Sequence, residues 1–508
     1  MHTFEPSSTP EPQDNSTPWY KELTRYHWFV LVVAALGWLF DCLDQQLFIL
    51  ARPAAMKDLV QATEGMDLKA LELARSNAGN YATSIFIAGW ATGGLIFGML
   101  GDRIGRAKTM LITILLYSAF TGLSAFAKTW IDFSVYRFLT GLGVGGEFAV
   151  GVALVAEVMP SRARTYSLTL LQSLSAFGNI SAAFINLGLG IAEEEGLVTS
   201  PWRLMFMIGA LPALLALFIR RRLKEPEQWL KVRAEQKADN KKMGSYAELF
   251  GNPLWRKHAI LGLLLGCSGV IGLWSVGFFA PDLIRSVQKR AVTAAVFDEH
   301  LAAAKGAQDT EKLALLDEIK QAQADPKAVS SLSEKAVEVK GKLDRTVNGR
   351  LSRWQSYTSI AINLGAFFGM FGFGALSQRI GRKPTFAIAL ISAFFSTVSV
   401  FWFLQDFWQI WVMVPVMGFC QLSLFAGYAI YFPELFPTRL RTTGTSFCYN
   451  VGRFLAALGP IVKGRLEAFF SDTPEPLRYA GMTMCFVFLI GLCVLPFLPE
   501  TNGKPLPE

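Results

Sequence analysis

Long apolar runs are the feature that most constrains how this chain can fold. A helix needs about 20 mostly apolar residues to cross the hydrocarbon core of a bilayer, and residues 107–127, 384–404 and 476–498 are runs of this kind. Only 17% of the 508 residues are charged, whereas soluble proteins have about 25%. The charges also gather in short segments between the runs. The sequence therefore predicts an all-α integral membrane protein.

Hydropathy predicts twelve transmembrane helices. We place them at residues 27–50, 77–100, 107–127, 131–157, 165–191, 202–219, 257–281, 354–377, 384–404, 408–431, 442–463 and 476–498. The first run is too long for the core of a signal peptide, so we interpret it as a membrane span. Residues 1–26, which carry acidic side chains among Pro, Ser and Thr, are predicted to be a disordered cytoplasmic tail.

The charges between the spans predict the orientation of the chain. The connections at 101–108, 160–164, 220–233, 378–383 and 437–441 are all basic. They face the cytoplasm if the N-terminus does, as the positive-inside rule requires. We therefore expect a multi-pass protein of the cytoplasmic membrane with both termini inside. This placement also explains the net charge of +8 without nucleic acid as a partner.

Two unrelated motifs repeat along the chain at nearly the same distance. Residues 157–165 and 434–442 both read E-x-x-P-[S/T]-R-x-R-T, with an offset of 434 − 157 = 277. Residues 98–106 resemble residues 374–382, with an offset of 374 − 98 = 276. Such a repeat predicts two parallel, pseudo-symmetric bundles of six helices, as in many secondary transporters.

The repeat divides the chain into domains. We place the N-terminal bundle at 27–219, a basic cytoplasmic linker at 220–256, the C-terminal bundle at 257–498 and a cytoplasmic tail at 499–508. Residues 282–353 are an insertion outside the repeat, on the extracytoplasmic side. Its pattern indicates two amphipathic helices, broken near Asp325 and Pro326. It is either a lid or docking cap, or a solvated hairpin tolerated in a loop.

At these motifs the chain resembles the major facilitator superfamily of transporters. The signature loop G-x-x-x-D-R-x-G-R-x-K and the fourth-span pattern R-x-x-x-G-x-x-x-G are matched by Gly98, Asp102, Arg103, Gly105, Arg106 and Lys108, and by Arg137, Gly141 and Gly145. The resemblance implies the twelve-helix fold of that superfamily and transport by alternating access. In the second half Gln378 replaces the signature aspartate.

Further motifs resemble two branches of the superfamily. Asp41 and Asp44 resemble the D-G-x-D motif of proton-coupled organic acid symporters, such as the aromatic-acid and lactate carriers, although Cys42 stands where Gly is usual. Gly452-Arg453 followed by Gly459-Pro460 is similar to the G-R…G-P of that branch. Residues 499–503 and 225–230 resemble two motifs of the sugar porters.

Charged residues deep within the spans predict the transport site. Asp41 lies about 21 Å along its helix from His27, and Arg453 about 18 Å from Arg441. Both spans begin on the cytoplasmic side, so these charges lie at similar depth, where transporters of this kind bind their substrates. Carboxylates that are close together in a low dielectric cannot all ionise, so at least one holds a proton. We predict that Asp41, Asp44 and Glu147 couple transport to protons.

Arg453 is the predicted partner of a substrate carboxylate, because a guanidinium binds carboxylates bidentately. The alternative is a permanent ion pair of Arg453 with Asp41 or Asp44. The polar residues predicted to line the substrate site with it are Asn450, Gln45, Gln172, Asn179, Asn363 and Gln421. Each of these amides is equally suited to a hydrogen bond between helices.

A third group of residues is predicted to gate transport, all of them on the cytoplasmic side except Arg137, which lies near the outer end of its span. It comprises Asp102, Arg103, Arg106, Arg137, Glu157, Arg162, Arg164, Glu434, Arg439 and Arg441. Asp102 is suited to cap a helix of the opposite half, and the repeated Glu and Arg residues are suited to form matching ion pairs. For the arginines the alternative is simple positive-inside anchoring, and for Arg137 it is a buried ion pair with a neighbouring helix.

These patterns predict a secondary active transporter that moves a small organic anion, a carboxylate, with protons. Two alternatives remain: a neutral-sugar transporter of the same fold, and a nutrient-sensing receptor that resembles a transporter. No ATP-binding loop, nucleophile–base pair or metal-ligand cluster stands out in the sequence, so we expect neither an enzyme nor a cofactor. The expected partners are the substrate, protons and membrane lipids, and we expect a monomer.

Overall fold

The computed structural model describes residues 18–62, 68–194, 197–198, 200–212, 222–238, 244–275, 280–324, 333–470, 472–473 and 475–507. Within these residues the regular structure is entirely helical. Ten helices of the described part are long and apolar enough to cross a membrane. The predicted all-α membrane fold is therefore confirmed. The part of the predicted N-terminal tail before residue 18 lies outside the described residues.

The first half of the chain contributes six helices that follow the predicted spans. They are α1 (Arg25–Leu59), α2 (Leu68–Ile104), α3 (Arg106–Ser124), α4 (Trp130–Val158), α5 (Ser161–Glu194) and α6 (Pro201–Ile208), preceded by the 3-10 helix η1 (Trp19–Glu22). Of the sixth predicted span, α6 covers the beginning, and residues 213–219 lie outside the described residues.

The linker and the second half follow. The linker holds α8 (Glu227–Ala238) and α9 (Tyr246–Gly251), and the second half holds α10 (Pro253–Ser275), α11 (Ala280–Gly306), α12 (Thr310–Ala324), α13 (Glu334–Ile380), α14 (Arg382–Phe403), α15 (Phe407–Glu434), α16 (Arg441–Asn450), α17 (Gly452–Ala456), α18 (Gly459–Phe469), α19 (Pro476–Met484), α20 (Val487–Val494) and the 3-10 helix η4 (Leu495–Phe497).

The eleventh predicted span differs from the prediction because it is three short helices rather than one. α16, α17 and α18 divide it after Asn450 and after Ala456. Gly452, Gly459 and Pro460 stand at these breaks. Glycine weakens a helix, and proline cannot donate the backbone hydrogen bond that would continue it.

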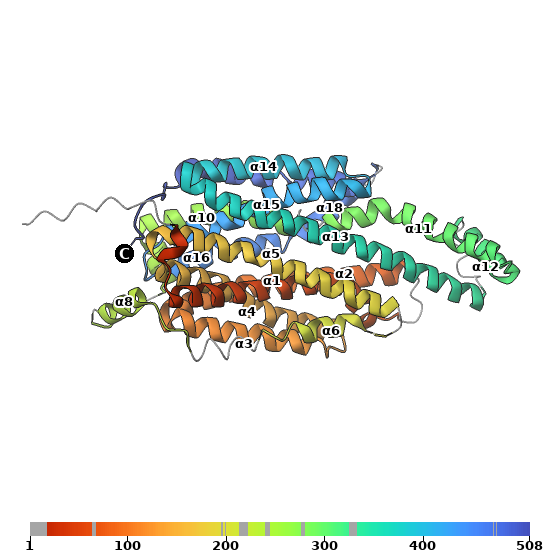
Figure 1. Cartoon of the computed structure of the whole chain (residues 1–508), viewed down its shortest axis with the longest axis horizontal. Helices are drawn as coiled ribbons and strands as arrows, with labels where there is room; N and C mark the ends of the chain where they lie inside the picture. The colour runs from red at the N-terminus through yellow and green to blue at the C-terminus, as the bar shows by residue number, and fades with distance from the viewer. Residues whose placement is uncertain are drawn as a thin grey trace, which may run out of the picture.

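The insertion projects from one end of the molecule. α11, α12 and the beginning of α13 extend beyond the bundle along its long axis, at the end opposite the C-terminus (Figure 1). They have a small apolar core of their own, which includes Val296, Leu316 and Leu343. The described break between α11 and α12 falls at residues 307–309, whereas the predicted break near 325–326 lies outside the described residues.

The two halves lie side by side, the first drawn from red to yellow and the second from green to blue (Figure 1). Between them, α16 packs against α2 and α4, and α13 packs against α5. We call the end that carries α8 and the C-terminus the ion-paired end, and the opposite end the insertion end. Large apolar side chains on the outside, such as Phe395 and Trp408, are exposed, as expected for a surface that faces lipid.

Candidate functional site

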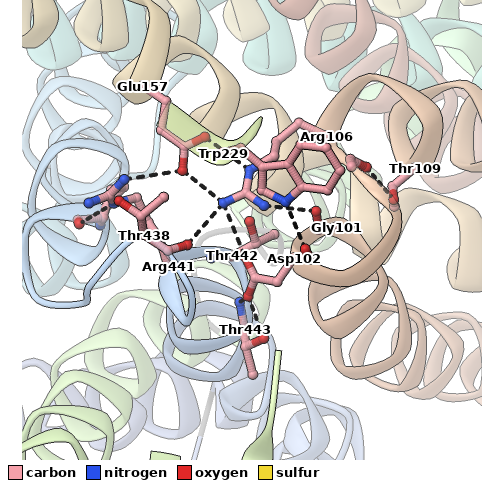
Figure 2. Close-up of polar contacts among 12 residues, drawn as sticks. Gly101, Asp102, Arg106, Thr109, Glu157, Trp229, Thr438, Arg441, Thr442 and Thr443 are labelled. Carbon is pink, nitrogen blue, oxygen red and sulfur yellow. Dashed lines mark hydrogen bonds and ion pairs between the residues drawn. The ribbon is translucent and has the colours of Figure 1, made fainter. Parts of the chain in front are cut away.

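A cluster of buried charges joins the two halves at the ion-paired end (Figure 2). Glu157, at the end of α4, accepts hydrogen bonds from the Nε and Nη2 atoms of Arg106 at 3.0 and 2.8 Å. The same carboxylate accepts a bond of 3.1 Å from Nη1 of Arg441 in the second half. The Glu157 and both arginine side chains are fully buried. Asp102 also lies 3.2 Å from Arg106, so two carboxylates of the first half balance one arginine from each half.

Asp102 makes the second connection in this cluster, as predicted for a helix cap. Its carboxylate accepts hydrogen bonds from the backbone N–H groups of Thr442 and Thr443, at 3.2 and 2.8 Å, in the first turn of α16. A negative charge at this position stabilises the helix dipole. Gly98 allows the two helices to approach, because an added Cβ there would lie 2.4 Å from the Cβ of Ser446.

The second half contains a related cluster. Arg382 forms an ion pair with Glu434 at 3.0 Å and donates a hydrogen bond of 3.1 Å to Thr165 of the first half. Glu500 accepts hydrogen bonds from the first backbone N–H groups of α14, as Glu225 does for α3. The repeated motifs thus form repeated structures.

The copies differ where the sequence differs. Gln378 stands at the position of Asp102 and supplies no carboxylate to cap α5, and its backbone carbonyl accepts a hydrogen bond from Asn502. Arg103, next to Asp102 and also predicted to gate, is exposed. The contact between the two halves is therefore stronger at the start of α16, which Asp102 caps, than at the start of α5.

The remaining arginines predicted to gate contact groups outside the repeated motifs. Arg162 pairs with Glu22 of the N-terminal segment at 2.9 Å, and Arg439 pairs with Glu248 of the linker at 2.7 Å. Arg164 donates a bond of 2.8 Å to a backbone carbonyl of α4. The linker and the N-terminal segment are thus attached to the ion-paired end.

Asp44 and Arg137 form a buried ion pair inside the first half. Their closest atoms are 3.3 Å apart, and Thr121 also donates a hydrogen bond of 2.6 Å to Asp44. Arg137 further donates to Ser124 and Thr140. All these contacts join α1, α3 and α4. In this structure Arg137 therefore has the alternative arrangement considered above, an ion pair between neighbouring helices, and makes no ion pair between the two halves.

Asp41 and Glu147 are buried without a cation. Neither carboxylate oxygen of Asp41 has a hydrogen-bond partner. Glu147 accepts one bond of 2.8 Å, from Thr113, and its other oxygen is unpartnered. That oxygen lies against Gly37, one turn before Asp41 on α1, because a Cβ on Gly37 would be 2.2 Å from it. The two carboxylates are close enough to interact electrostatically.

Arg453 is a buried cation without a carboxylate. Its guanidinium is held between the rings of Trp90 and Tyr449, 4.2 and 4.3 Å from their centroids. Nη1 donates hydrogen bonds to the Tyr449 carbonyl and to the Asn450 side chain, at 2.7 and 2.8 Å, while Nε has no acceptor. Among the described residues Arg453 has no ion-pair partner, so the alternative of a permanent pair with Asp41 or Asp44 is absent from this structure.

Three of the predicted substrate-binding amides connect the halves directly. Asn179 of α5 donates a hydrogen bond of 2.7 Å to Asn363 of α13. Asn450 of α16 donates one of 3.2 Å to the backbone carbonyl of Gly145 on α4. These amides therefore also have the helix-pairing role that the sequence left open.

Three of the predicted amides carry unused hydrogen-bond acceptors among the described residues. The side-chain oxygens of Gln172, Asn179 and Gln421 are buried without a partner, although the amide nitrogen of Gln421 donates to Thr397 at 2.9 Å. Gln45 is buried as well. Buried polar atoms are normally paired, and exceptions are candidates for contacts with a ligand.

Sequence reasoning missed several residues of these clusters. They are Glu225 and Glu500, which cap α3 and α14, Trp229, which donates a hydrogen bond of 2.7 Å to the Asp102 carbonyl, and Trp90 and Tyr449, which enclose Arg453. The two caps had a usable signal, because 500 − 225 = 275 is close to the offset of the repeats. Trp229 lies in the 225–230 motif, whereas Trp90 and Tyr449 had no signal, since aromatics are abundant throughout the chain.

Comparisons with known proteins agree with this architecture. Residues 60–248 match the family model described as Sugar (and other) transporter, and residues 354–508 match that of the Major Facilitator Superfamily. A putative metabolite transport protein of Haemophilus influenzae is 25% identical over 96% of this chain and 99% of its own length. A probable 4-methylmuconolactone transporter of Cupriavidus pinatubonensis is 27% identical over 96% and 93%.

A solved structure shares the fold. The proton:xylose symporter XylE, bound to 6-bromo-6-deoxy-D-glucose, superposes with a TM-score of 0.68. The similarity covers 95% of this chain and 98% of that one, at 17% sequence identity. The predicted arrangement of two pseudo-symmetric six-helix bundles is thus confirmed by a known example.

Proposed function

This chain belongs to the major facilitator superfamily and is a multi-pass membrane transporter, and from that premise we propose that it carries a small organic anion with protons across the cytoplasmic membrane by alternating access. The similarity to a probable 4-methylmuconolactone transporter supports a small organic substrate. The choice of an anion rests on the buried charges of this chain.

Arg453 is the observation that carries the proposal. A buried charge costs several kcal/mol unless it is paired, yet this guanidinium is fully buried and has no carboxylate partner among the described residues. A carboxylate on the substrate supplies the missing charge. The stacking on Trp90 and Tyr449 holds the planar group in one orientation. Its unbonded N–H edge is then suited to a bidentate contact with a carboxylate.

Asp41 and Glu147 are the proposed proton carriers. Two neighbouring carboxylates in a low dielectric, with no cation between them, cannot both ionise without a large cost. One proton therefore stays bound to this pair of carboxylates. Its release completes the coupled transport of substrate and proton. Asp44 differs because Arg137 neutralises it. We assign Asp44 to holding α1 against α4, so that Asp41 keeps its place.

The ion-paired end is the proposed cytoplasmic gate. Its basic connections favour the cytoplasmic side by the positive-inside rule. In this structure Glu157 and Asp102 hold the halves together there. Inward opening requires the bond from Arg441 to Glu157 and the cap on α16 to break, while the contacts within each half persist.

Uptake into proteoliposomes under an imposed pH gradient tests the proposal. Candidate sugar acids, aromatic acids and short monocarboxylates are first ranked by how much each raises the melting temperature of the purified protein. The best carboxylate should then accumulate when the outside is acidic, and the accumulation should collapse when a protonophore is added. Hexose equilibration independent of pH would replace this function with sugar transport. Binding without flux would indicate a receptor.

A further inference from the structure

A polar cavity that opens to the surface lies far from Arg453. It has a volume of about 510 Å³ and lies between the end of α1 and the beginnings of α2 and α6. Its wall includes Lys57, Asp58, Leu71, Arg75, Ser200 and Arg203. The other end of α1 lies at the ion-paired end, where Tyr26 bonds to Lys224 of the linker. The cavity is therefore at the insertion end, which the proposed function places outside the membrane.

The charge in this cavity is positive. Among the described residues, Lys57, Arg75 and Arg203 line it, against one carboxylate, that of Asp58. That carboxylate already accepts hydrogen bonds from Trp202 at 2.7 Å and from Ser200 at 3.3 Å. Three cations and one carboxylate therefore face the cavity, and one oxygen of that carboxylate is bonded to residues at the start of α6.

The two arginines are held in place by backbone carbonyls. Arg75 donates to the carbonyls of Val60 and Lys57 at the end of α1, at 3.1 and 3.2 Å. Arg203 donates to those of Ala125 and Ala127 at the end of α3, at 2.6 and 3.1 Å. Capping a helix end explains why these arginines are present. It leaves unexplained the exposed Lys57, whose ammonium group has no partner among the described residues, and the open volume between the three cations.

We propose that this cavity is a collecting site that binds small organic anions at the outer face before they reach Arg453. The inference rests on the proposed function for its ligand and for the side of the membrane. A recess lined by one sign of charge concentrates counter-ions and speeds their capture. The fixed guanidinium groups supply N–H donors for a carboxylate, and Lys57 supplies a mobile charge at the entrance.

Reversal of the charge at Lys57 tests the site in transport. The Lys57→Glu variant should fold normally, because its side chain is exposed. At low ionic strength its KM for carboxylate uptake should rise by about three- to tenfold with an unchanged maximal rate. In about 1 M salt, where charges are screened beyond about 3 Å, the difference from the wild type should vanish. Lys289→Glu, an exposed lysine of α11 at the same end, is the matched control and should leave KM unchanged.

An equal rise of KM in both variants would show a general effect of surface charge and overturn the site, as would an unchanged KM in Lys57→Glu. Crystals of the full chain soaked with 4-bromobenzoate separate this result from a failure of the proposed function. Anomalous bromine signal in the cavity of the wild type, absent in Lys57→Glu, supports the site. Signal beside Arg453 alone contradicts the site, and signal in the cavity alone supports it while contradicting the proposed substrate role of Arg453.

Discussion

The buried charged residues of this chain differ in whether a residue of opposite charge lies beside them. Asp44 and Arg137 neutralise each other at 3.3 Å, whereas Asp41, Glu147 and Arg453 have no opposite charge within ion-pair distance among the described residues. An unbalanced buried charge is costly, and it persists where function uses it. The unbalanced residues, rather than all buried ionisable residues, are therefore the ones to test for roles in transport.

Arg453→Ala should weaken substrate binding. Loss of hydrogen bonds to a charged group costs about 1.5–3 kcal/mol, so the affinity for a carboxylate should fall by roughly 10- to 150-fold. The substrate-free variant loses an unpaired buried charge but also the ring contacts and two hydrogen bonds of Arg453, so its own melting temperature without substrate is the reference. The shift of the melting temperature on adding substrate measures the loss. Arg453→Lys should keep part of the affinity, and normal saturation by Arg453→Ala would refute the assignment.

Replacement by Asn should change the melting temperature differently at Asp44 and at Asp41, although the two residues are three positions apart. Asp44→Asn leaves Arg137 buried without its counter-ion, which costs about 3–5 kcal/mol, so the melting temperature should fall clearly. Asp41→Asn removes a carboxylate that has no partner and should melt no lower than the wild type. In proteoliposomes Asp41→Asn should lose accumulation driven by pH but keep exchange of substrate across the membrane.

A second substitution checks the reason given for Asp44. Adding Arg137→Gln to Asp44→Asn should restore part of the melting temperature, because the uncompensated guanidinium is gone. Accumulation driven by pH at the wild-type level in Asp41→Asn would remove this residue from proton coupling.

At the scale of elements, α16 holds the ion-paired end closed. Glu157→Gln should open this end, because Arg441 would lose its carboxylate partner across the two halves, whereas Arg106 keeps Asp102. Spin labels at exposed positions 108 and 379, one in each half, should move apart by several ångströms in part of the population. Glu434→Gln is the matched control, since Glu434 accepts bonds only from Arg382 and Thr501 of its own half among the described residues. Equal separation in both variants would contradict a special role of Glu157.

The elements were predictable from sequence where one local signal defines them. Apolar runs located α1, α4 and α14, and the repeated motif located the turns before α5 and α16. The breaks between α16, α17 and α18 were not predicted, because the apolar run continues through them and only Gly452, Gly459 and Pro460 mark them. An apolar run indicates that a segment lies in the membrane. It does not indicate whether that segment is one regular helix.

The contacts of the site were less predictable than its residues. Asp44 and Arg137 are 93 residues apart, and Arg439 and Glu248 are 191 apart. No periodicity relates such positions, because their meeting depends on which helices pack together. Asp102 is the exception, since the family resemblance and the helix dipole together indicated a cap on the opposite half. The predicted matching of Glu and Arg between repeats held for Glu157 with Arg441, while Arg162 and Arg439 found partners outside the repeats.

At the scale of the whole molecule, the symmetry of the two halves is incomplete. α16 is capped by Asp102, whereas Gln378 provides no equivalent charge for α5. The C-terminal segment adds to this difference, because the Pro507 carbonyl accepts a hydrogen bond of 3.0 Å from Arg441. If the ion-paired end is the proposed gate, its opening requires the release of the C-terminal segment from Arg441 as well as of the Asp102 cap.

The insertion should be dispensable for transport. Its apolar core is separate from that of the bundle, and Glu299 with Arg350 joins α11 to α13 at its base. Replacing residues 301–347 with a short Gly-Ser linker should therefore keep this ion pair, leave the melting temperature nearly unchanged and keep uptake within about twofold of the wild type. The projection of α11 and α12 away from the bundle (Figure 1) favours this outcome over a lid. Loss of uptake in a variant that still melts normally and still binds substrate would instead mean that the insertion takes part in the transport cycle.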